Sequence, residues 1–444
     1  MAAIGKQRLV RQMEESRKRT LAMLEPLDDP VLTASHSELM APLVWDLAHV
    51  GYFEELWISR RIDGRPPLIA EHDDIYDAFR HSRADRAELP LLDPVRARRY
   101  LKAVRELTLA TLETIDLDRR DPLLADGYIF GLVLQHEQQH RETMLQTLQL
   151  WGGKYPPAAD PEMLLPPEAA AASVTDAAAA VGPAAETLVE GGEFLLGDDG
   201  AAWAYDNERP HHVVTVAPFR IDTAPVTNRA YAAFIGDGGY RRESLWSPAG
   251  LEWLAGAGSG TDAPLGWQPE GDGDWSRLRF GHVETLPADE PVQHVNFHEA
   301  EAFARWAGRR LPTEIEWEYA ASNGSRKTSW PWGEEGPARS RANLGAGSYR
   351  PAPVGSLPKG ASRSGLVHLL GDVWEWTSSR FTGYPGFEAF PYREYSEVFF
   401  DGDYRVLRGG SWATEPGAIR TTFRNWDVPA RRQIFAGFRC ARDA

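Results

Sequence analysis

One histidine and a later pair of histidines constrain this 444-residue chain more than any other feature. Residues 136–140 read His-Glu-Gln-Gln-His, inside a stretch (residues 128–144) whose apolar positions recur with the period of a helix. Side chains four positions apart share one helix face, so the imidazoles of His136 and His140 can reach a single metal ion. His49 lies in an earlier stretch of helical pattern. Three neutral imidazoles on two helices can hold a divalent metal and leave coordination positions open for reactants.

The same five residues also fit a different metal chemistry. His-Glu-x-x-His on a helix is the zinc-binding pattern of metallopeptidases, in which Glu137 would act as the general base. The pattern is short enough to arise by chance, and a zinc peptidase needs a third ligand that the sequence after His140 does not obviously offer. A lone histidine such as His49 on an amphipathic helix is more often a polar or packed residue than a ligand. A zinc peptidase and a structural role both stay open at this point.

Composition places the chain among ordinary globular proteins, with 43% hydrophobic and 25% charged residues and a length that suits two or three domains. The formal net charge of −16 argues against a nucleic-acid partner, because phosphate binding requires basic surfaces. Cys440 is the single cysteine, so no intramolecular disulfide can form. The charged N-terminus and the lack of an 18-residue apolar run predict no signal peptide and no membrane partner. We therefore expect a cytoplasmic protein.

Amino-acid composition and hydrophobic pattern divide the chain into three parts. Residues 1–151 are helical in pattern and predict a four-helix bundle that carries the metal ligands. The four helices are expected at residues 5–27, after a capping box at residues 35–38, at residues 93–117 and around the histidine pair. Residues 152–187 are rich in Pro and Ala and predict a linker. Residues 188–444 combine short apolar runs with many Gly, Pro and Trp, and only two convincing helices, at 228–234 and 297–308, which predicts an α+β domain.

Motifs in residues 188–444 resemble those of the formylglycine-generating enzymes, the sulfatase-modifying factors. The motifs that carry the resemblance are Gly-Gly-Glu-Phe-Leu-Leu-Gly from Gly191, Pro-His-His-Val-Val-Thr-Val from Pro210, Pro-Val-Thr-Asn-Arg-Ala-Tyr from Pro225, Arg-Leu-Pro-Thr-Glu-Ile-Glu-Trp-Glu-Tyr-Ala-Ala from Arg310, Gly-Asp-Val-Trp-Glu-Trp-Thr from Gly371, Arg-Gly-Gly-Ser-Trp from Arg408 and Ala-Gly-Phe-Arg-Cys from Ala436. The resemblance implies a C-type-lectin-like fold for this domain. Formylglycine-generating enzymes use a cysteine pair for copper and oxygen chemistry, so a chain with one cysteine cannot share that activity.

Residues 1–150 resemble the DinB-like four-helix bundle, whose members bind a metal through three histidines. The combination of the two domains resembles the iron(II)-dependent sulfoxide synthases of ergothioneine biosynthesis, the hercynine oxygenases, and residues 423–439 look like the C-terminal motif of that family. The resemblance implies Fe(II) held by His49, His136 and His140. The family reaction joins the thiol sulfur of γ-glutamylcysteine to imidazole C2 of hercynine (Nα-trimethylhistidine) and oxidises the sulfur, giving γ-glutamyl-hercynylcysteine sulfoxide. One O₂ accepts all four electrons, so no external reductant is needed.

The resemblance also implies which residues hold hercynine. Asn425 and Trp426 match family positions that bind it, and its quaternary ammonium favours aromatic faces because it cannot donate a hydrogen bond. Gln139, inside the histidine pair, resembles the residue that meets the imidazole of hercynine. Without the resemblance, Gln139 would be an ordinary solvated helix residue as readily as a ligand contact.

The thiol donor carries two carboxylates and an amine. Arginine pairs carboxylates in a bidentate manner, so Arg83 and Arg86 are the expected clamp, and Asp427 is expected to hold the amine. Taken alone, two arginines in a charged loop would more often be surface residues. Arg431 and Arg432 are interpreted as structural or peripheral. Relatives that use free cysteine or a selenium donor leave the identity of the donor open, and the two-arginine clamp favours γ-glutamylcysteine.

A tyrosine near the iron is expected to donate a proton to bound oxygen, and the family places it in the loop before Arg-Gly-Gly-Ser-Trp. We predict Tyr392 as this acid and Tyr395 as a substrate contact, while Tyr384 remains possible. A tyrosine in such an aromatic stretch is otherwise most often a core residue. A third class of function also stays open, a non-catalytic binding module, because lectin-like domains often only bind. In that case substitution of His136 would spare function.

Overall fold

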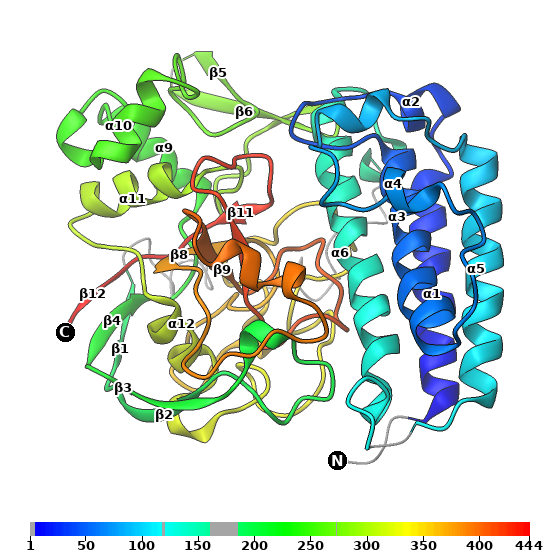
Figure 1. Cartoon of the computed structure of the whole chain (residues 1–444). Helices are drawn as coiled ribbons and strands as arrows, with labels where there is room; N and C mark the ends of the chain where they lie inside the picture. The colour runs from blue at the N-terminus through cyan, green and yellow to red at the C-terminus, as the bar shows by residue number, and fades with distance from the viewer. Residues whose placement is uncertain (1–4, 118–119, 160–184, 272) are drawn as a thin grey trace. The chain divides into compact units, whose positions relative to one another are not determined.

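The protein divides into two units, Met1–Pro156 and Pro157–Ala444, in a computed structural model that describes residues 5–117, 120–159, 185–271 and 273–444. The first unit is helical, and the second mixes helices with short strands (Figure 1). This order confirms the predicted fold class of a DinB-like bundle followed by a sulfatase-modifying-factor domain.

Four long helices build the first unit (Figure 1). They are α1 (Lys6–Leu24), α3 (Leu43–Glu54, continued by the π-helical η1, Glu55–Ile62), α5 (Pro94–Thr114) and α6 (Tyr128–Trp151). The short helices α2 (Asp29–Thr33) and α4 (His72–Ile75) lie in the connections. Asp93 caps α5 as its sequence predicts, because its side chain accepts a hydrogen bond from the Arg96 amide and Pro94 occupies the first turn.

Helix α3 is the central helix of the bundle, because every one of its 12 residues is buried. Gly51 lets α5 approach it closely, since a Cβ at this position would come within 3.1 Å of the side chains of Leu101 and Tyr100. The predicted capping box at residues 35–38 is wrong as the start of this helix. The chain enters α3 through Pro42, whose fixed φ suits a helix entry, and the box residues lie before it in irregular structure.

A buried cluster of two arginines and two glutamates ties three of the helices to α6. Arg17 of α1 lies 2.8 Å from both Glu54 of α3 and Glu137 of α6, and Arg105 of α5 lies 2.7 Å from Glu54 and 2.9 Å from Glu137. Both glutamate side chains are fully buried. Because each charge faces two opposite charges, the desolvation cost of the four ions is offset only while the cluster is complete.

Among its described residues, the second unit contains four small sheets and four α-helices, and most of them are labelled in Figure 1. One sheet consists of β1 (Glu186–Val189), β4 (Phe219–Asp222) and β12 (Ala441–Asp443), and a second of β2 (Gly192–Leu196) and β3 (His212–Val216). A third consists of β5 (Trp267–Gly271), β6 (Asp274–Arg279) and β7 (His282–Thr285). The fourth consists, in spatial order, of β10 (Asn425–Asp427), β9 (Arg405–Arg408), β8 (Trp374–Arg380) and β11 (Ala436–Gly437). Three of these sheets are antiparallel throughout, and β11 pairs with β8 in parallel. The helices are α9 (Asn228–Gly236), α10 (Pro248–Ala255), α11 (Phe297–Trp306) and α12 (Glu314–Ala321). The sequence predicted α9 and α11 but missed α10 and α12, which have only eight residues each.

Several residues of the sequence motifs in this unit form ion pairs in the protein interior. Arg408 of β9 pairs with Glu318 of α12, and neither side chain is exposed. Arg424, directly before β10, binds Glu314 of α12 through two hydrogen bonds of 2.9 Å. In a domain with few long elements, these buried pairs fix the positions of strand ends that hydrophobic packing alone would leave loosely specified.

The predicted linker at residues 152–187 lies mostly outside the described residues. Its first part includes η4 (Pro156–Ala159), where the Ala158 carbonyl accepts a hydrogen bond of 3.0 Å from Arg279. Its last two residues belong to strand β1. In the described part of the chain, no helix has both the length and the apolarity needed to cross a bilayer.

The Glu54 cluster generates a stability prediction. Glu54→Gln removes one of two negative charges that face Arg17 and Arg105, so we expect the bundle to lose about 3–5 kcal/mol of unfolding free energy. Glu113→Gln on the exposed face of α5 is the control, with an expected change within about 0.5 kcal/mol. Denaturant titration followed by circular dichroism measures both, and equal stability of the two variants would show that the cluster does not hold the bundle.

Candidate metal and substrate site

Helices α3 and α6 bring the three predicted histidines together. The ligand-capable atoms of His49, His136 and His140 all lie within 4.8 Å of one another, which makes this the one group of metal-binding geometry found among the described residues. His136 and His140 are one helical turn apart on α6, and His49 faces them from α3. The ring centroids of His49 and His140 are 4.5 Å apart, and those of His49 and His136 are 5.0 Å apart.

The nitrogens are arranged for a metal. His49 Nδ1 lies 2.7 Å from the Tyr76 carbonyl, so Nδ1 carries the proton and Nε2 presents a lone pair. That Nε2 lies 3.2 Å from Nε2 of His136. Two ligands at about 2.1 Å from one metal and at right angles would be about 3.0 Å apart. The spacing therefore fits neighbouring ligands of one ion and leaves room for three further ligands in an octahedron.

Neighbouring groups fix the orientation of each imidazole. His140 Nδ1 lies 2.9 Å from a carboxylate oxygen of Asp46, an arrangement that fixes the ring orientation and directs Nε2 toward the cluster. The Trp45 ring stacks on His49 with centroids 4.6 Å apart, and the Phe53 ring stacks on His136 at 3.7 Å. Trp45, His49 and Phe53 are spaced by four residues, so one face of α3 supplies a ligand and both stacking partners.

The surroundings keep His49 and His136 neutral. Burial lowers the pKa of His49 well below its ordinary value of 6.5, and the neighbouring His140 lowers it further. Burial and the same neighbour also lower the pKa of His136. Neutral imidazole is the metal-binding form, so the site is prepared to take a cation near neutral pH.

Glu137 is not available as the base of a zinc peptidase. One of its oxygens accepts hydrogen bonds from Arg17 (2.8 Å) and Thr20 (2.9 Å), and the other accepts from Arg105 (2.9 Å). Burial would raise the pKa of Glu137, but the two guanidinium groups outweigh it and hold that pKa at about 2. The carboxylate therefore lies in the ion cluster and not beside the histidines, which argues against the peptidase interpretation.

The two predicted clamp arginines differ in their surroundings. Arg83 is exposed and donates to the Leu39 carbonyl at 3.3 Å. Arg86 is buried, its guanidinium carbon lies 3.7 Å from the centroid of the Trp45 ring, and it donates to the Ala78 carbonyl. Burial lowers the pKa of Arg86 to about 10, so it remains charged at neutral pH. Arg86 thus extends the stack of Trp45 on His49. Gln139, the residue before His140, is half-buried on α6.

Three residues predicted to bind substrate, Asn425, Trp426 and Asp427, form strand β10 of the second unit. Trp426 stacks face to face on Phe381 with centroids 4.1 Å apart, and the Tyr395 ring meets it edge-on at 5.9 Å. Asn425 and Asp427, at the ends of the same strand, are half-buried. Two of the residues predicted for hercynine, Asn425 and Trp426, and the residue predicted for the donor amine, Asp427, therefore share one short strand.

The three loop tyrosines separate into two environments. Tyr384 belongs to the hydrophobic core, beneath the guanidinium of Arg424 at 4.1 Å from its ring centroid, and burial raises its pKa well above the ordinary value. Tyr392 and Tyr395 are half-buried, with ring centroids 6.1 Å apart. The geometry therefore favours Tyr392 and Tyr395 over Tyr384 for contact with a ligand.

Arg431 is a residue that the sequence analysis set aside. It lies one helical turn's spacing after Asp427, and its Nε is 3.3 Å from the Asp427 carboxylate. Its Nε and Nη1 atoms are buried without a hydrogen-bond partner among the described residues. By contrast, Arg432 is structural as expected, because it binds Glu299 through two hydrogen bonds. Asp427 and Arg431 meet across a turn in which the Arg431 amide donates to the Val428 carbonyl at 3.1 Å, a contact for which the sequence carries no periodic signal.

Comparison with known families agrees with both units. Residues 12–144 match the DinB superfamily, and residues 172–444 match the sulfatase-modifying factor enzyme 1-like domain. The Formylglycine-generating enzyme of Streptomyces coelicolor is 35% identical, over 62% of this chain and 97% of its own length.

The relatives that match both units include two mycobacterial hercynine oxygenases. The Hercynine oxygenase of Mycolicibacterium smegmatis is 49% identical and covers 99% of this chain and 100% of its own length. The Hercynine oxygenase of Mycobacterium tuberculosis is 48% identical, over 98% of this chain and 99% of its own length.

A three-histidine cluster in a DinB-type bundle, joined to a sulfatase-modifying-factor domain, defines a metal-dependent oxygenase. Full-length identity of this degree then gives the family. The chain belongs to the hercynine oxygenases, the sulfoxide synthases of ergothioneine biosynthesis that its motifs indicated, and it is an oxidoreductase. A module that only binds is thereby excluded.

Asp46 provides a test of the histidine cluster that leaves the three imidazoles in place. Asp46→Ala removes the partner that orients His140, so we expect metal affinity to fall about 10- to 100-fold. Asp46→Asn can still accept a hydrogen bond from Nδ1 through its amide oxygen, so its metal affinity should fall less. Competition with a chelator measures the affinities, and unchanged affinity in Asp46→Ala would remove the carboxylate from the site.

The lowered histidine pKa values predict a pH dependence for the metal-free protein. Unfolded histidines take up protons near pH 6.5, whereas His49 and His136 resist protonation when folded. Their contribution to stability should therefore be complete above pH 6.5 and decline as the pH falls toward the lowered folded pKa values. Thermal midpoints between pH 8 and 5 measure this decline, and a His49→Gln/His136→Gln double variant should show a shallower one. Parallel curves for the two proteins would contradict the assignment of neutral buried imidazoles.

Proposed function

We propose that this chain joins γ-glutamylcysteine to imidazole C2 of hercynine and oxidises the new thioether, with Fe(II) as its metal and O₂ as the oxidant. The thiol and the imidazole each lose one hydrogen, one oxygen atom enters the sulfoxide, and the other leaves as water. The substrates thereby supply all four electrons that O₂ accepts. The observation that carries the proposal is the convergence of three histidine nitrogens within 4.8 Å, in a chain related over its whole length to hercynine oxygenases.

His49, His136 and His140 are the proposed ligands. Fe(II) bound to them would supply activation of O₂ and a coordination position for the thiolate sulfur. Three neutral imidazoles leave the full 2+ charge of the metal uncompensated, which favours an anionic sulfur ligand. The stacked rings of Trp45 and Phe53 exclude water from two sides of the ligand set and hold its geometry.

Hercynine is proposed to bind through Gln139, Asn425 and Trp426. The Trp426 indole, held flat against Phe381, offers a π-face to the trimethylammonium group. Asn425 can donate to the carboxylate of hercynine through its side-chain amide, since its Oδ1 is occupied by the Trp426 backbone amide at 2.9 Å. Gln139 is proposed to hydrogen-bond the imidazole ring, so that C2 is oriented toward the sulfur.

The thiol donor is proposed to bind through Arg83, Arg86 and Asp427. Exposed Arg83 can reorient to pair with a carboxylate in a bidentate manner. Buried Arg86 is preorganised by its stack on Trp45 and supplies a fixed positive charge. Asp427 would hold the amine of the donor, and Arg431, whose Nε lies 3.3 Å from it, would orient the Asp427 carboxylate. A donor with two carboxylates suits this set of charges better than free cysteine.

Tyr392 is the proposed acid, and Tyr395 the proposed substrate contact. A half-buried phenol can deliver a proton to oxygen in the reaction without admitting bulk water. The Tyr395 ring meets the Trp426 ring edge-on with centroids 5.9 Å apart, which supports a role for Tyr395 in contact with hercynine.

The direct test is product analysis after anaerobic loading with Fe(II). The protein is mixed with hercynine and γ-glutamylcysteine, O₂ is admitted, and products are identified by mass. We expect the sulfoxide conjugate and one O₂ consumed per product. Cysteine in place of γ-glutamylcysteine should react with a lower kcat/KM. Zinc-loaded protein is the control and should form no conjugate, and a preference for cysteine would overturn the choice of donor.

The clamp gives a more specific prediction. Arg83→Ala removes an exposed carboxylate partner and should raise the KM for γ-glutamylcysteine about 10-fold or more, while the KM for hercynine stays unchanged. Arg86→Ala also removes a support of the Trp45 and His49 stack, so we expect kcat to fall in addition. Steady-state kinetics with each substrate varied separates the two effects. An unchanged KM for γ-glutamylcysteine in Arg83→Ala would remove this residue from the clamp.

A further inference from the structure

The loop that carries Tyr392 and Tyr395 is fastened at both ends by one buried carboxylate. The backbone amide of Phe390 donates to Oδ2 of Asp206 at 3.2 Å, and the Ser396 hydroxyl donates to Oδ1 of the same side chain at 2.5 Å. Asp206 is 2% exposed and lies far away in the sequence, in the 3₁₀ turn η6 (Asp206–Glu208). A single residue therefore bridges the two ends of the loop, an arrangement called here the Asp206 bridge.

Both neighbours of Asp206 reinforce the bridge. The Asn207 side chain donates to the Ser396 hydroxyl at 3.1 Å, so this hydroxyl is held by two consecutive residues of η6. Tyr205 is buried, and its ring stacks on Tyr395 with centroids 4.4 Å apart and an interplanar angle of 19°. Three consecutive residues thus contact the tyrosine loop, through a stack, a carboxylate and an amide.

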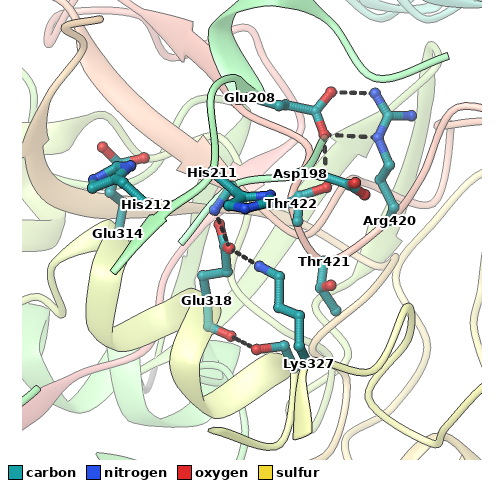
Figure 2. Close-up of polar contacts among 12 residues, drawn as sticks. Asp198, Glu208, His211, His212, Glu314, Glu318, Lys327, Arg420, Thr421 and Thr422 are labelled. Carbon is teal, nitrogen blue, oxygen red and sulfur yellow. Dashed lines mark hydrogen bonds and ion pairs between the residues drawn. The ribbon is translucent and has the colours of Figure 1, made fainter. Parts of the chain in front are cut away.

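The turn that carries the bridge is itself rigidly held. Glu208 accepts hydrogen bonds of 2.7 Å from both Arg420 and Thr422, and Figure 2 shows these contacts. Its Oε1 also accepts from the Tyr205 backbone amide at 2.9 Å. Arg424 donates to the Asn207 carbonyl at 2.6 Å, immediately before Asn425 and Trp426 of β10. The same turn therefore connects the tyrosine loop with the strand that carries the proposed hercynine contacts.

We propose that Asp206 is a positioning residue of the oxygenase reaction, which fixes the backbone of residues 390–396 and thereby the placement of the Tyr392 phenol. A buried carboxylate is costly, and packing alone would be served as well by an apolar side chain. Burial raises the pKa of Asp206 to about 6, which leaves the carboxylate largely ionised at neutral pH and able to accept both hydrogen bonds. Hydrogen bonds to an ionised acceptor are stronger than neutral ones, so the ends of the loop are held more firmly than a neutral side chain could hold them.

This inference rests on the proposed role of Tyr392, but the bridge has a readout of its own. Arg393 is the neighbour of Tyr392, and its side chain is 70% exposed, so trypsin can cleave after it once the loop opens. Asp206→Ala removes both bridging hydrogen bonds, and we expect the cleavage rate after Arg393 to rise about 10-fold or more. Ser396→Ala releases one end only and should lie between this variant and the wild type.

Turnover provides the second readout. Because small displacements of a catalytic group are costly, we expect Asp206→Ala to lower kcat about 10- to 100-fold while metal content and the KM for γ-glutamylcysteine stay near wild type. Asp206→Asn should recover part of the resistance to cleavage after Arg393 and part of kcat. Its amide oxygen can accept from the Phe390 amide, and its amide nitrogen can donate to the Ser396 hydroxyl. Asp198→Ala is the matched control, since the Asp198 carboxylate accepts from the Gly200 and Ala201 amides of its own turn, and it should change neither the cleavage rate nor kcat.

The outcomes separate the possibilities. Unchanged cleavage after Arg393 in Asp206→Ala would overturn the bridge, and faster cleavage with unchanged kcat would overturn its role in positioning. Loss of kcat in Asp198→Ala equal to that in Asp206→Ala would reduce the effect to general destabilisation and contradict the proposal. If Tyr392→Phe retains full kcat while Asp206→Ala loses it, the assignment of the acid fails and the positioning of the loop stands.

Discussion

The approach of α3 to α6 is the constraint on which the candidate metal site depends. It places Nε2 of His49 3.2 Å from Nε2 of His136, and the ion cluster of Arg17, Glu54, Arg105 and Glu137 holds the two helices at that separation. Glu54 follows Phe53, which stacks on His136, and Glu137 follows His136 directly. On each helix, a residue of the metal site is therefore followed directly in the sequence by a glutamate of the ion cluster. A shift of one helix along the other would break the ion pairs before it could separate the imidazoles.

Buried ion pairs also fix the second unit, whose helices and strands are mostly short. Buried pairs such as Arg408 with Glu318 and Arg424 with Glu314 account for the motif residues by which the domain is recognised. The residues proposed to touch substrate are neighbours of these motif residues. Asn425 and Trp426 follow Arg424, and the tyrosine loop is fastened to the turn whose Glu208 binds Arg420. Structural ion pairs thus determine where the functional side chains are presented.

Much of this organisation could be predicted from the sequence, and the misses have physical causes. The i, i+4 spacing identified His136 with His140, and the helical period of the first 151 residues identified the bundle. Asp46 could not be found in this way, because it binds a histidine on another helix and contacts between helices leave no local spacing. The capping box at residues 35–38 misled because its pattern was complete while Pro42 decided where α3 begins. Without the family resemblance, Arg83 and Arg86 would both be interpreted as surface residues, and the burial of Arg86 against Trp45 arises from tertiary packing that overrides a charged local sequence.

The position of the metal tests the central claim most directly. Crystals of the Fe(II)-loaded protein, grown without oxygen and measured at the iron absorption edge, give an anomalous map in which iron is identified by its own signal. We expect one peak at about 2 Å from Nε2 of each of His49, His136 and His140. A peak elsewhere, or one bonded to fewer than three of these nitrogens, would contradict the three-histidine site and the chemistry built on it.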